Sequence, residues 1–368
     1  MVKYFKSGAE RLPLPIFFPD ATRGIVKTLD SKDLENLNLP GLLVNTYHLY
    51  LNPGEKTIKK FDGVRNFMNW KNAIISDSGG FQVMSIVKKY PKMGRITDKG
   101  VLFKTAEGIS TLFTPELSIK FQMALDTDLL VVLDEFTHPN ASHQEAKESV
   151  DRTIAWALRS KNEFKKNYAE KRLSKVERPY LIAVVQGGKY LDLRIECTKK
   201  LSEIGFDGLG YGGSTLTELG KFDYEVAKVI AENSPKDYLL YGLGVGKPDD
   251  IVGCYKLGFQ IFDCVLPTRD ARHKRLYIYN SSSIDKIDVN SENFYSYYHP
   301  GKEKYKNDPK PISNACDCLL CQRYSRAYLY HLFKIKDISA FRLASIHNLR
   351  FYTILMEKLR KETSKFSR

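Results

Sequence analysis

Short hydrophobic runs alternate with longer amphipathic stretches through most of the chain. The runs are continuous rather than alternating, which is typical of strands buried on both faces of a parallel sheet. They cover residues 14–17, 41–45, 73–77, 129–134, 180–186, 206–213, 238–244 and 259–263. The pattern therefore predicts eight buried strands.

The stretches between the runs carry helix signals. Residues 115–125 begin with a proline, which is common at the first position of a helix. Ser142 and Glu145 have the spacing of a capping box at the start of a helix over residues 142–168. Residues 247–257 carry acids in their first turn, where they complement the helix dipole. Strands that alternate with helices in this way predict an α/β fold, a (β/α)8 TIM-like barrel, with an open doubly wound sheet as the alternative.

Several of the predicted strands end in a polar residue or a glycine. In a (β/α)8 barrel the carboxyl ends of the strands meet at one mouth, where the active site lies. The residues at these ends are Asn45, Asp77, Asp134, Gln186, Gly212, Gly213, Gly244 and Asp263. We therefore expect side chains that are far apart in the sequence to meet in one pocket.

The composition is that of a globular protein with a basic surface. Hydrophobic residues make up 43% of the 368 residues, and the formal net charge is +14. This charge suggests a polyanionic partner such as a nucleic acid, although a general lysine bias would give the same surplus. The chain shows no signal peptide after Met1 and no run of ~18 apolar residues, so we expect no membrane span and a cytoplasmic location.

Cys316, Cys318 and Cys321 form a close cluster. In a reducing compartment such a cluster favours a metal over disulfides. Three thiolates need one further ligand for a tetrahedral zinc ion, and His331 and His347 are both candidates. We expect a closed, structural Zn²⁺ site.

Two segments depart from the alternation of strands and helices. Residues 88–113 form an insertion with a predicted hairpin whose turn is Asp98 to Gly100, and residues 276–315 are polar and irregular. We expect residues 1–275 to contain the barrel and its active site. Residues 276–368 should contain the zinc subdomain and the closing C-terminal helices, integral to the same barrel domain.

Asp77 and Asp263 each end a predicted strand. Two carboxylates at one mouth are suited to glycosidic chemistry, in which one is the nucleophile and the other the general acid/base. Arg269 and Arg272 follow Asp263 closely, and guanidinium groups bind phosphates well. The alternative for the arginines is a solvated cluster with Asp270.

Paired glycines follow three of the predicted strands, within residues 76–82, 184–188 and 210–214. Such turns let backbone N–H groups approach a flat ligand, although any barrel contains turns. Phe81 offers a flat apolar face to a nucleobase. Gln186 and Asp134 offer hydrogen-bonding groups for a base edge.

Several motifs together resemble the tRNA-guanine transglycosylases. They are NTYHLYLNPG, SDSGGFQVMS, VVQGGKYLDLR, GVGKPDDIV, FDCVLPTRDAR, CDCLLC followed by YSRAYLYHLF, and IHN. The resemblance runs in order from about residue 12 to residue 355, and the length resembles that of the bacterial enzyme of the queuosine pathway. It implies a (β/α)8 barrel with a zinc subdomain that exchanges guanine at the anticodon wobble position (G34) of tRNA for a 7-deazaguanine.

The resemblance also implies roles for individual residues. Asp263 would be the nucleophile that attacks C1′ of the ribose, and Asp77 would be the general acid/base. The residues that would contact the base are Asp134, Gln186, Gly213, Phe81 and Leu243, the last two as stacking partners. Arg269 and Arg272 would hold a U-G-U anticodon segment.

For the metal, the resemblance implies Zn²⁺ bound by Cys316, Cys318, Cys321 and His347. It also implies a tRNA anticodon stem-loop and a free 7-deazaguanine base as partners, and a homodimer.

Some positions depart from the bacterial family pattern. Phe136 stands where the family usually has Cys, and Ser214 and Leu216 lie in the segment after the glycine pair of residues 212–213. In relatives these positions line the pocket around the 7-substituent. The bulk of Leu216 favours 7-aminomethyl-7-deazaguanine as donor over free queuine, and Glu218 is in place to help the pocket accept both bases.

Other functions remain open from the sequence. A relative that inserts a deazapurine into DNA would share the chemistry, and a non-catalytic RNA-binding subunit would share the surface. A zinc-stabilised sugar-processing barrel would use the two carboxylates but not the paired glycines. The presence of both Asp77 and Asp263 favours an active enzyme.

Overall fold

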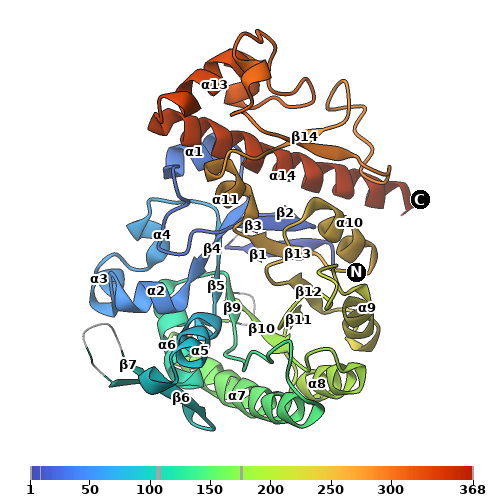
Figure 1. Cartoon of the computed structure of the whole chain (residues 1–368). Helices are drawn as coiled ribbons and strands as arrows, with labels where there is room; N and C mark the ends of the chain where they lie inside the picture. The colour runs from blue at the N-terminus through green and yellow to red at the C-terminus, as the bar shows by residue number, and fades with distance from the viewer. Residues whose placement is uncertain (1, 9, 105–107, 109, 175–176, 367–368) are drawn as a thin grey trace.

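The computed structural model describes residues 2–8, 10–104, 108, 110–174 and 177–366. Among these residues, eight parallel strands form one sheet in the order β3-β13-β12-β11-β10-β9-β5-β4. A parallel bridge between Asp20 and Leu43 joins the two edges, and the Ala21 N–H donates to the Leu43 carbonyl at 2.7 Å. The sheet is thus a nearly closed barrel with helices around it (Figure 1), and the predicted (β/α)8 fold is confirmed.

The strands of the barrel are β3 (Ile16–Pro19), β4 (Gly41–Asn45), β5 (Ala73–Asp77), β9 (Leu129–Val131), β10 (Tyr180–Val185), β11 (Gly208–Tyr211), β12 (Leu239–Gly242) and β13 (Ile261–Cys264). The other strands are β1 (Tyr4–Ser7), β2 (Glu10–Pro13), β6 (Gly94–Thr97), β7 (Gly100–Lys104), β8 (Ser110–Phe113), β14 (Leu276–Tyr279) and β15 (Tyr295–Tyr298).

The helices before β13 are α1 (Ser31–Asn36), α2 (Thr46–Leu51), α3 (Glu55–Lys60), α4 (Val64–Phe67), α5 (Gly80–Lys89), η1 (Pro91–Met93), α6 (Pro115–Leu125), α7 (His143–Glu170), α8 (Leu191–Ile204), α9 (Tyr224–Asn233) and α10 (Pro248–Lys256). Those after β13 are α11 (Leu266–Arg272), η2 (Glu303–Tyr305), α12 (Leu319–Arg323), α13 (Arg326–Lys334) and α14 (Ile338–Phe366).

Two hydrophobic layers hold the barrel together. Inside it, alternate residues of the strands pack on one another, among them Ile16, Phe18, Ile75 and Ile261. Phe5 of the β1–β2 hairpin is fully buried against Phe18, with ring centroids 5.8 Å apart, and closes the end at which the strands begin. We call this end the floor and the carboxyl ends of the strands the mouth.

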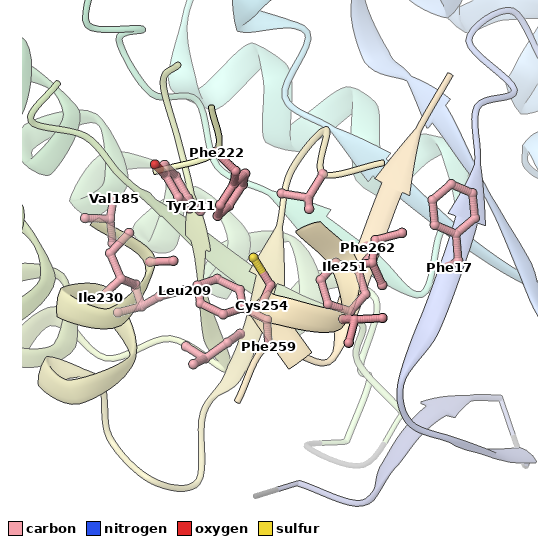
Figure 2. Close-up of a cluster of buried hydrophobic side chains, with 14 of the residues drawn as sticks. Phe17, Val185, Leu209, Tyr211, Phe222, Ile230, Ile251, Cys254, Phe259 and Phe262 are labelled. Carbon is pink, nitrogen blue, oxygen red and sulfur yellow. The ribbon is translucent and has the colours of Figure 1, made fainter. Parts of the chain in front are cut away.

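The outer layer lies between the strands and their helices. Figure 2 shows part of it, where Leu209, Phe259 and Phe262 of the sheet side meet Ile230 of α9 and Ile251 of α10. Side chains on both faces of a parallel strand are buried in this way, which explains the continuous hydrophobic runs of the sequence.

Two additions extend the barrel. The segment between α5 and α6 forms the three-stranded antiparallel sheet β6-β7-β8, with the predicted turn between β6 and β7. After β13, the chain forms the β14–β15 hairpin, α12, α13 and the long helix α14, which gather on one side of the barrel (Figure 1).

The strand predictions are confirmed in number and order, but their limits shift. The first strand covers Ile16–Pro19 rather than residues 14–17, and the fourth ends at Val131 rather than at residue 134. The predicted capping box of Ser142 and Glu145 is present at the start of α7. The shift of the first strand brings Asp20 to the mouth, which the hydrophobic pattern did not predict.

Candidate active site

Asp77 is the last residue of β5, and its carboxyl group is enclosed by uncharged donors. Oδ1 accepts hydrogen bonds from the N–H groups of Thr46 and Gly79, both at 3.0 Å, and Oδ2 accepts one from Asn45 Nδ2 at 2.6 Å. The Asn45 Oδ1 caps α2 by accepting from His48 N at 2.9 Å, which turns its amide nitrogen toward Asp77. Burial raises the pKa of Asp77 to about 7 despite these bonds.

Asp263 lies in β13 and is also held by uncharged donors. Its Oδ1 accepts from the Tyr241 hydroxyl at 2.7 Å and from the Gly244 N–H at 3.0 Å. Burial raises the pKa of Asp263 to about 6, and the negative charge of Asp20 adds to this effect. Because both bonds go to Oδ1, the carboxyl group has a fixed orientation.

Asp77 and Asp263 lie near the same space at the mouth. The negative charge of Asp263 contributes to the raised pKa of Asp77. The charges of both carboxylates also contribute to the raised pKa of Tyr241, after its burial. Among the residues that the structure describes, no lysine, arginine or histidine forms an ion pair with either carboxylate. Acids whose pKa values are raised in this way near neutrality suit proton transfer and nucleophilic attack at pH 7.

Asp134 and Gln186 form a second polar group at the mouth. Gln186 is fully buried; its Nε2 donates to Asp134 Oδ2 at 2.6 Å, and its Oε1 accepts from the Thr137 N–H at 3.1 Å. Burial raises the pKa of Asp134 to about 6. Gln186 therefore orients Asp134, and their role in binding a base edge stays a prediction.

Gly213 lies directly against this pair. Its φ is +80°, and a Cβ atom there would lie 3.1 Å from Gln186 Oε1. Both facts favour glycine at this position. Leu243 follows β12 and covers Gly210, where a Cβ would come within 2.3 Å of its Cδ1.

Phe81 lies at the start of α5 and is 54% exposed, which leaves its ring open to a ligand. Phe136 packs edge-on against it, with ring centroids 5.2 Å apart and an interplanar angle of 74°. Phe136 thus supports the orientation of Phe81. This contact gives a structural role to a residue that departs from the family pattern.

Arg269 and Arg272 lie on α11, the short helix that follows β13. Arg269 is exposed, and Arg272 is half-buried with a buried Nη1 that has no hydrogen-bond partner in the described part of the chain. Asp270 does not bind these two residues as the alternative would require; it pairs with Arg275, at 2.8 and 3.0 Å. Two guanidinium groups are therefore free of Asp270 beside the mouth.

The cysteine cluster and His347 converge on one point. The Sγ atoms of Cys316, Cys318 and Cys321 lie 3.6, 3.5 and 3.3 Å from His347 Nδ1, and all four atoms lie within 4.8 Å of one another. A tetrahedral zinc ion with Zn–S of about 2.3 Å and Zn–N of about 2.1 Å separates its ligand atoms by roughly 3.5–3.8 Å. The four residues fit such an ion.

The imidazole of His347 is oriented for this role. Its Nε2 lies 2.8 Å from the Tyr277 carbonyl, which can only accept a hydrogen bond, so the proton belongs on Nε2 and the Nδ1 lone pair faces the three sulfur atoms. The next residue, Asn348, donates to the carbonyls of Pro267 and Arg275 at 2.9 and 3.1 Å. The cluster is thereby linked to the segment that follows Asp263.

Two residues of the mouth were missed in the sequence. Tyr241 lies within a hydrophobic strand and is typical of a core residue, and its place one residue before the end of β12 puts it on the inward-facing side with Leu239. Asp20 directly follows β3, whereas the apolar run of the sequence ends at Phe17 and gives no sign that Asp20 reaches the mouth. Its carboxylate accepts from the Thr22 hydroxyl and lies near Asp263 and Arg272.

A (β/α)8 barrel with half-buried acids at its mouth, and with a Cys3His cluster that could hold a metal ion, is typical of a barrel enzyme. The family model described as queuine tRNA-ribosyltransferase matches residues 5–365. The chain belongs to this family and is thus a pentosyltransferase, as the resemblance to the tRNA-guanine transglycosylases predicted.

Curated relatives carry the same family name. The chain is 39% identical over 348 residues to the queuine tRNA-ribosyltransferase of Thermoanaerobacter pseudethanolicus, a match that covers 94% of this chain and 85% of the relative. It is 38% identical over 349 residues to that of Vibrio campbellii and over 347 residues to that of a Psychrobacter species, with the same shares covered. In the described residues, no helix has both the length and the apolar character needed to span a bilayer.

Proposed function

We propose that this transglycosylase exchanges guanine at the wobble position of tRNAs with a U-G-U anticodon segment for a 7-deazaguanine, through a covalent bond between Asp263 and the ribose. The observation that carries the proposal is the pair Asp77 and Asp263. Both carboxyl groups are half-buried at one mouth, both are held by uncharged donors, and both have raised pKa values. Neither is neutralised by a described cation.

In the first step, an Asp263 carboxylate oxygen attacks C1′ of the target ribose. The bond between C1′ and N9 breaks, its electron pair moves to the departing guanine, and protonated Asp77 supplies a proton to that base. The bonds to Tyr241 and Gly244 fix Oδ1, which leaves Oδ2 to attack. Asp263 must be ionised and Asp77 protonated, and the pKa values of about 6 and about 7 allow both near neutral pH.

In the second step, the chemistry runs in reverse with a new base. Ionised Asp77 takes a proton from the incoming 7-deazaguanine, whose ring nitrogen attacks C1′ and displaces Asp263. Asn45, Thr46 and Gly79 donate to Asp77 and stabilise its ionised form between the two steps.

The base would lie between Phe81 and Leu243, with its edge toward Asp134, Gln186 and Gly213. The carboxylate of Asp134 accepts hydrogen bonds from ring N–H and amino groups, and the Gly213 N–H donates to a ring acceptor. The target nucleotide has to leave its stack to reach this pocket, as in other enzymes that act on bases.

The RNA would bind along the basic surface beside the mouth. Arg269 and the half-buried Arg272 would hold the anticodon segment, and the partnerless Nη1 of Arg272 supports a role in binding an acceptor group of the RNA. The net charge of +14 favours a polyanion of this kind.

The favoured donor is 7-aminomethyl-7-deazaguanine. Leu216 is 51% exposed near the glycine pair, and Phe136 holds Phe81 by an edge contact, so bulky side chains crowd the region assigned to the 7-substituent. Glu218 forms an exposed salt bridge with Lys189 at 2.8 Å, and a cationic substituent would have to replace Lys189 to pair with it. Free queuine is the second candidate donor.

The test is to incubate the protein with tRNA labelled with guanine at position 34 and to measure release of the label in the presence of each deazaguanine. We expect release with the aminomethyl base, and a covalent protein–RNA adduct on denaturing gels that Asp263→Ala abolishes. An adduct that persists in Asp263→Ala refutes the assignment of the nucleophile. Label release from DNA but not from tRNA would favour the DNA-directed relative, and no release with any base would favour the RNA-binding subunit.

The Cys3His cluster would bind a structural zinc ion. The ion would join α12 and the loop before it to α14, and it would supply no group to the reaction. Cys318→Ser should lose the metal, as measured by atomic absorption, and destabilise the C-terminal part of the chain, because ligand binding and folding are coupled at such sites. Full metal content in that variant would contradict the assignment.

A further inference from the structure

Arg194 of α8 is a fully buried arginine behind the proposed base pocket. Buried cations are normally paired with a carboxylate, because removing a charge from water is costly. Among the described residues Arg194 forms no ion pair, and its Nη2 has no hydrogen-bond partner. Other groups must therefore stabilise the buried charge of its guanidinium.

The guanidinium binds three backbone carbonyls from two neighbouring segments, the ends of β10 and β11. Nη1 donates to Val185 at 2.6 Å and to Gly212 at 2.9 Å, and Nε donates to Gly188 at 2.9 Å. Its centre lies 5.3 Å from the ring of Tyr211, which offers its face to the cation. Tyr211 is held in turn by Phe222, with ring centroids 5.7 Å apart (Figure 2).

These carbonyls belong to the ends of β10 and β11, next to the proposed base contacts. The Gly212 carbonyl and the Gly213 N–H are parts of the same peptide group, which is planar and trans, so the two point in opposite directions. Arg194 holds the carbonyl on its own side, and the Gly213 N–H must point away from it.

Gly213 also lies close to the guanidinium of Arg194. A Cβ atom at this residue would lie 3.3 Å from Arg194 Nη2 and 3.1 Å from Gln186 Oε1. The peptide therefore rests on the arginine and on the glutamine that orients Asp134. The arginine and the glutamine together fix the donors and acceptors of one wall of the pocket.

We propose that Arg194 is a positioning residue for purine recognition, which turns the peptide between Gly212 and Gly213 so that its N–H faces the purine edge. The inference rests on the proposed function, because it concerns the pocket for the exchanged base. Without the guanidinium, the carbonyl of Gly212 loses its partner and the peptide can rotate. Base binding should then weaken while tRNA binding, which uses other residues, is preserved.

The experiment measures incorporation of radiolabelled guanine into guanine-containing tRNA by the full chain, with both substrates varied. The variants are Arg194→Met, which removes charge and donors, and Arg194→Lys, which keeps the charge. We expect the KM for guanine to rise about tenfold in Arg194→Met, equivalent to about 1.4 kcal/mol, with the KM for tRNA unchanged. In Arg194→Lys the KM for guanine should rise less, because the ammonium group keeps the charge and can still donate to part of the carbonyl set.

Arg178→Lys is the matched control. Arg178 lies beside the same two strands but at the floor, where it pairs with Asp207 at 2.7 and 2.8 Å. This variant should keep the wild-type KM for guanine. An equal rise in Arg178→Lys would show a general loss of structure and overturn the proposal.

Circular dichroism and thermal unfolding identify the folded variants. A folded Arg194→Met with the wild-type KM for guanine overturns the inference. If that variant does not fold, Arg194→Lys decides, and an unchanged KM for guanine again overturns it. A wild-type protein that incorporates no guanine would instead refute the proposed function itself.

Discussion

At the floor of the barrel, Asp207 binds both terminal nitrogens of Arg178, whereas at the mouth Asp263 binds a phenol hydroxyl and a peptide N–H. Asp128, also at the floor, accepts from Arg65 Nη2 at 2.7 Å and from the Ile74 N–H at 2.8 Å. Both floor acids directly precede a barrel strand, β9 or β11. The mouth acid Asp77 ends a strand and has uncharged donors.

We infer from this difference that the acids at the floor serve stability and that those at the mouth serve the reaction. An ion pair lowers the free energy of the ionised carboxylate and makes it a poor nucleophile and a poor acid at neutral pH. Uncharged donors orient a carboxyl group without cancelling its charge. The floor acids thus anchor strands, and the mouth acids keep pKa values near the pH at which they would react.

The largest expected effect comes from Asp263→Asn. The side chain keeps its shape, and its Oδ1 can still accept from Tyr241 and Gly244, but it cannot attack C1′. We expect kcat to fall by more than about 10⁴-fold in the labelled-guanine exchange assay.

The same variant should keep or increase the free energy of unfolding at pH 8. Burial raises the pKa of Asp263, so its ionised form opposes folding at pH 8, and the neutral amide removes this cost. The free energy of unfolding at pH 8 is measured by urea denaturation. If Asp263→Asn lost as much stability as we expect for Asp207→Asn at the floor, the proposed difference between floor and mouth acids would be wrong.

Asp207→Asn, at the floor, should lower the stability of the protein and leave its activity unchanged, the opposite of Asp263→Asn. The amide loses the charge of two charge-assisted bonds and leaves Arg178, whose side chain is 18% exposed, without its ionic partner. The free energy of unfolding should fall by about 2–3 kcal/mol in urea denaturation, with kcat within about twofold of the wild type. If kcat fell tenfold or more while stability was unchanged, the floor would share in the chemistry.

The smallest effect expected is in the pH dependence. The first step needs ionised Asp263 and protonated Asp77, so kcat/KM for tRNA should fall about tenfold per pH unit below about 6 and above about 7. Asp207→Asn should keep both the acidic and the alkaline fall of kcat/KM, and Asp77→Asn should lose the alkaline fall. A flat profile from pH 5 to 9 in the wild type would contradict the assignment of the two acids.

Most of the barrel and of its mouth could be predicted from the sequence, because strands buried on both faces appear as continuous hydrophobic runs. Each hydrophobic run became a strand, and polar residues at the ends of the runs gave Asp77, Asp134 and Gln186. The limits of strands were less certain, since a run of apolar residues does not show where hydrogen bonding starts, and Asp20 was missed for this reason.

Other features depend on contacts that a linear pattern does not contain. His347 and His331 were equal candidates until the family resemblance and then the fold separated them. Arg194 has the polarity of a surface residue, yet it shares a helix face with Cys197 and Thr198, which are buried. That spacing was the available signal, and it gave no indication that the guanidinium would bind carbonyls rather than a carboxylate.

The helix α14 has a consequence for how the enzyme matures on the ribosome. The hydroxyl of Tyr352 donates to the Gly246 carbonyl, Asn348 holds the Pro267 carbonyl, and Arg360 donates to the Pro15 carbonyl at 2.8 Å. All of these groups belong to barrel segments that are synthesised well before α14. A nascent chain that has already produced β13 therefore still lacks the support of α14 at both ends of the barrel, and the enzyme should acquire activity only after translation has passed α14.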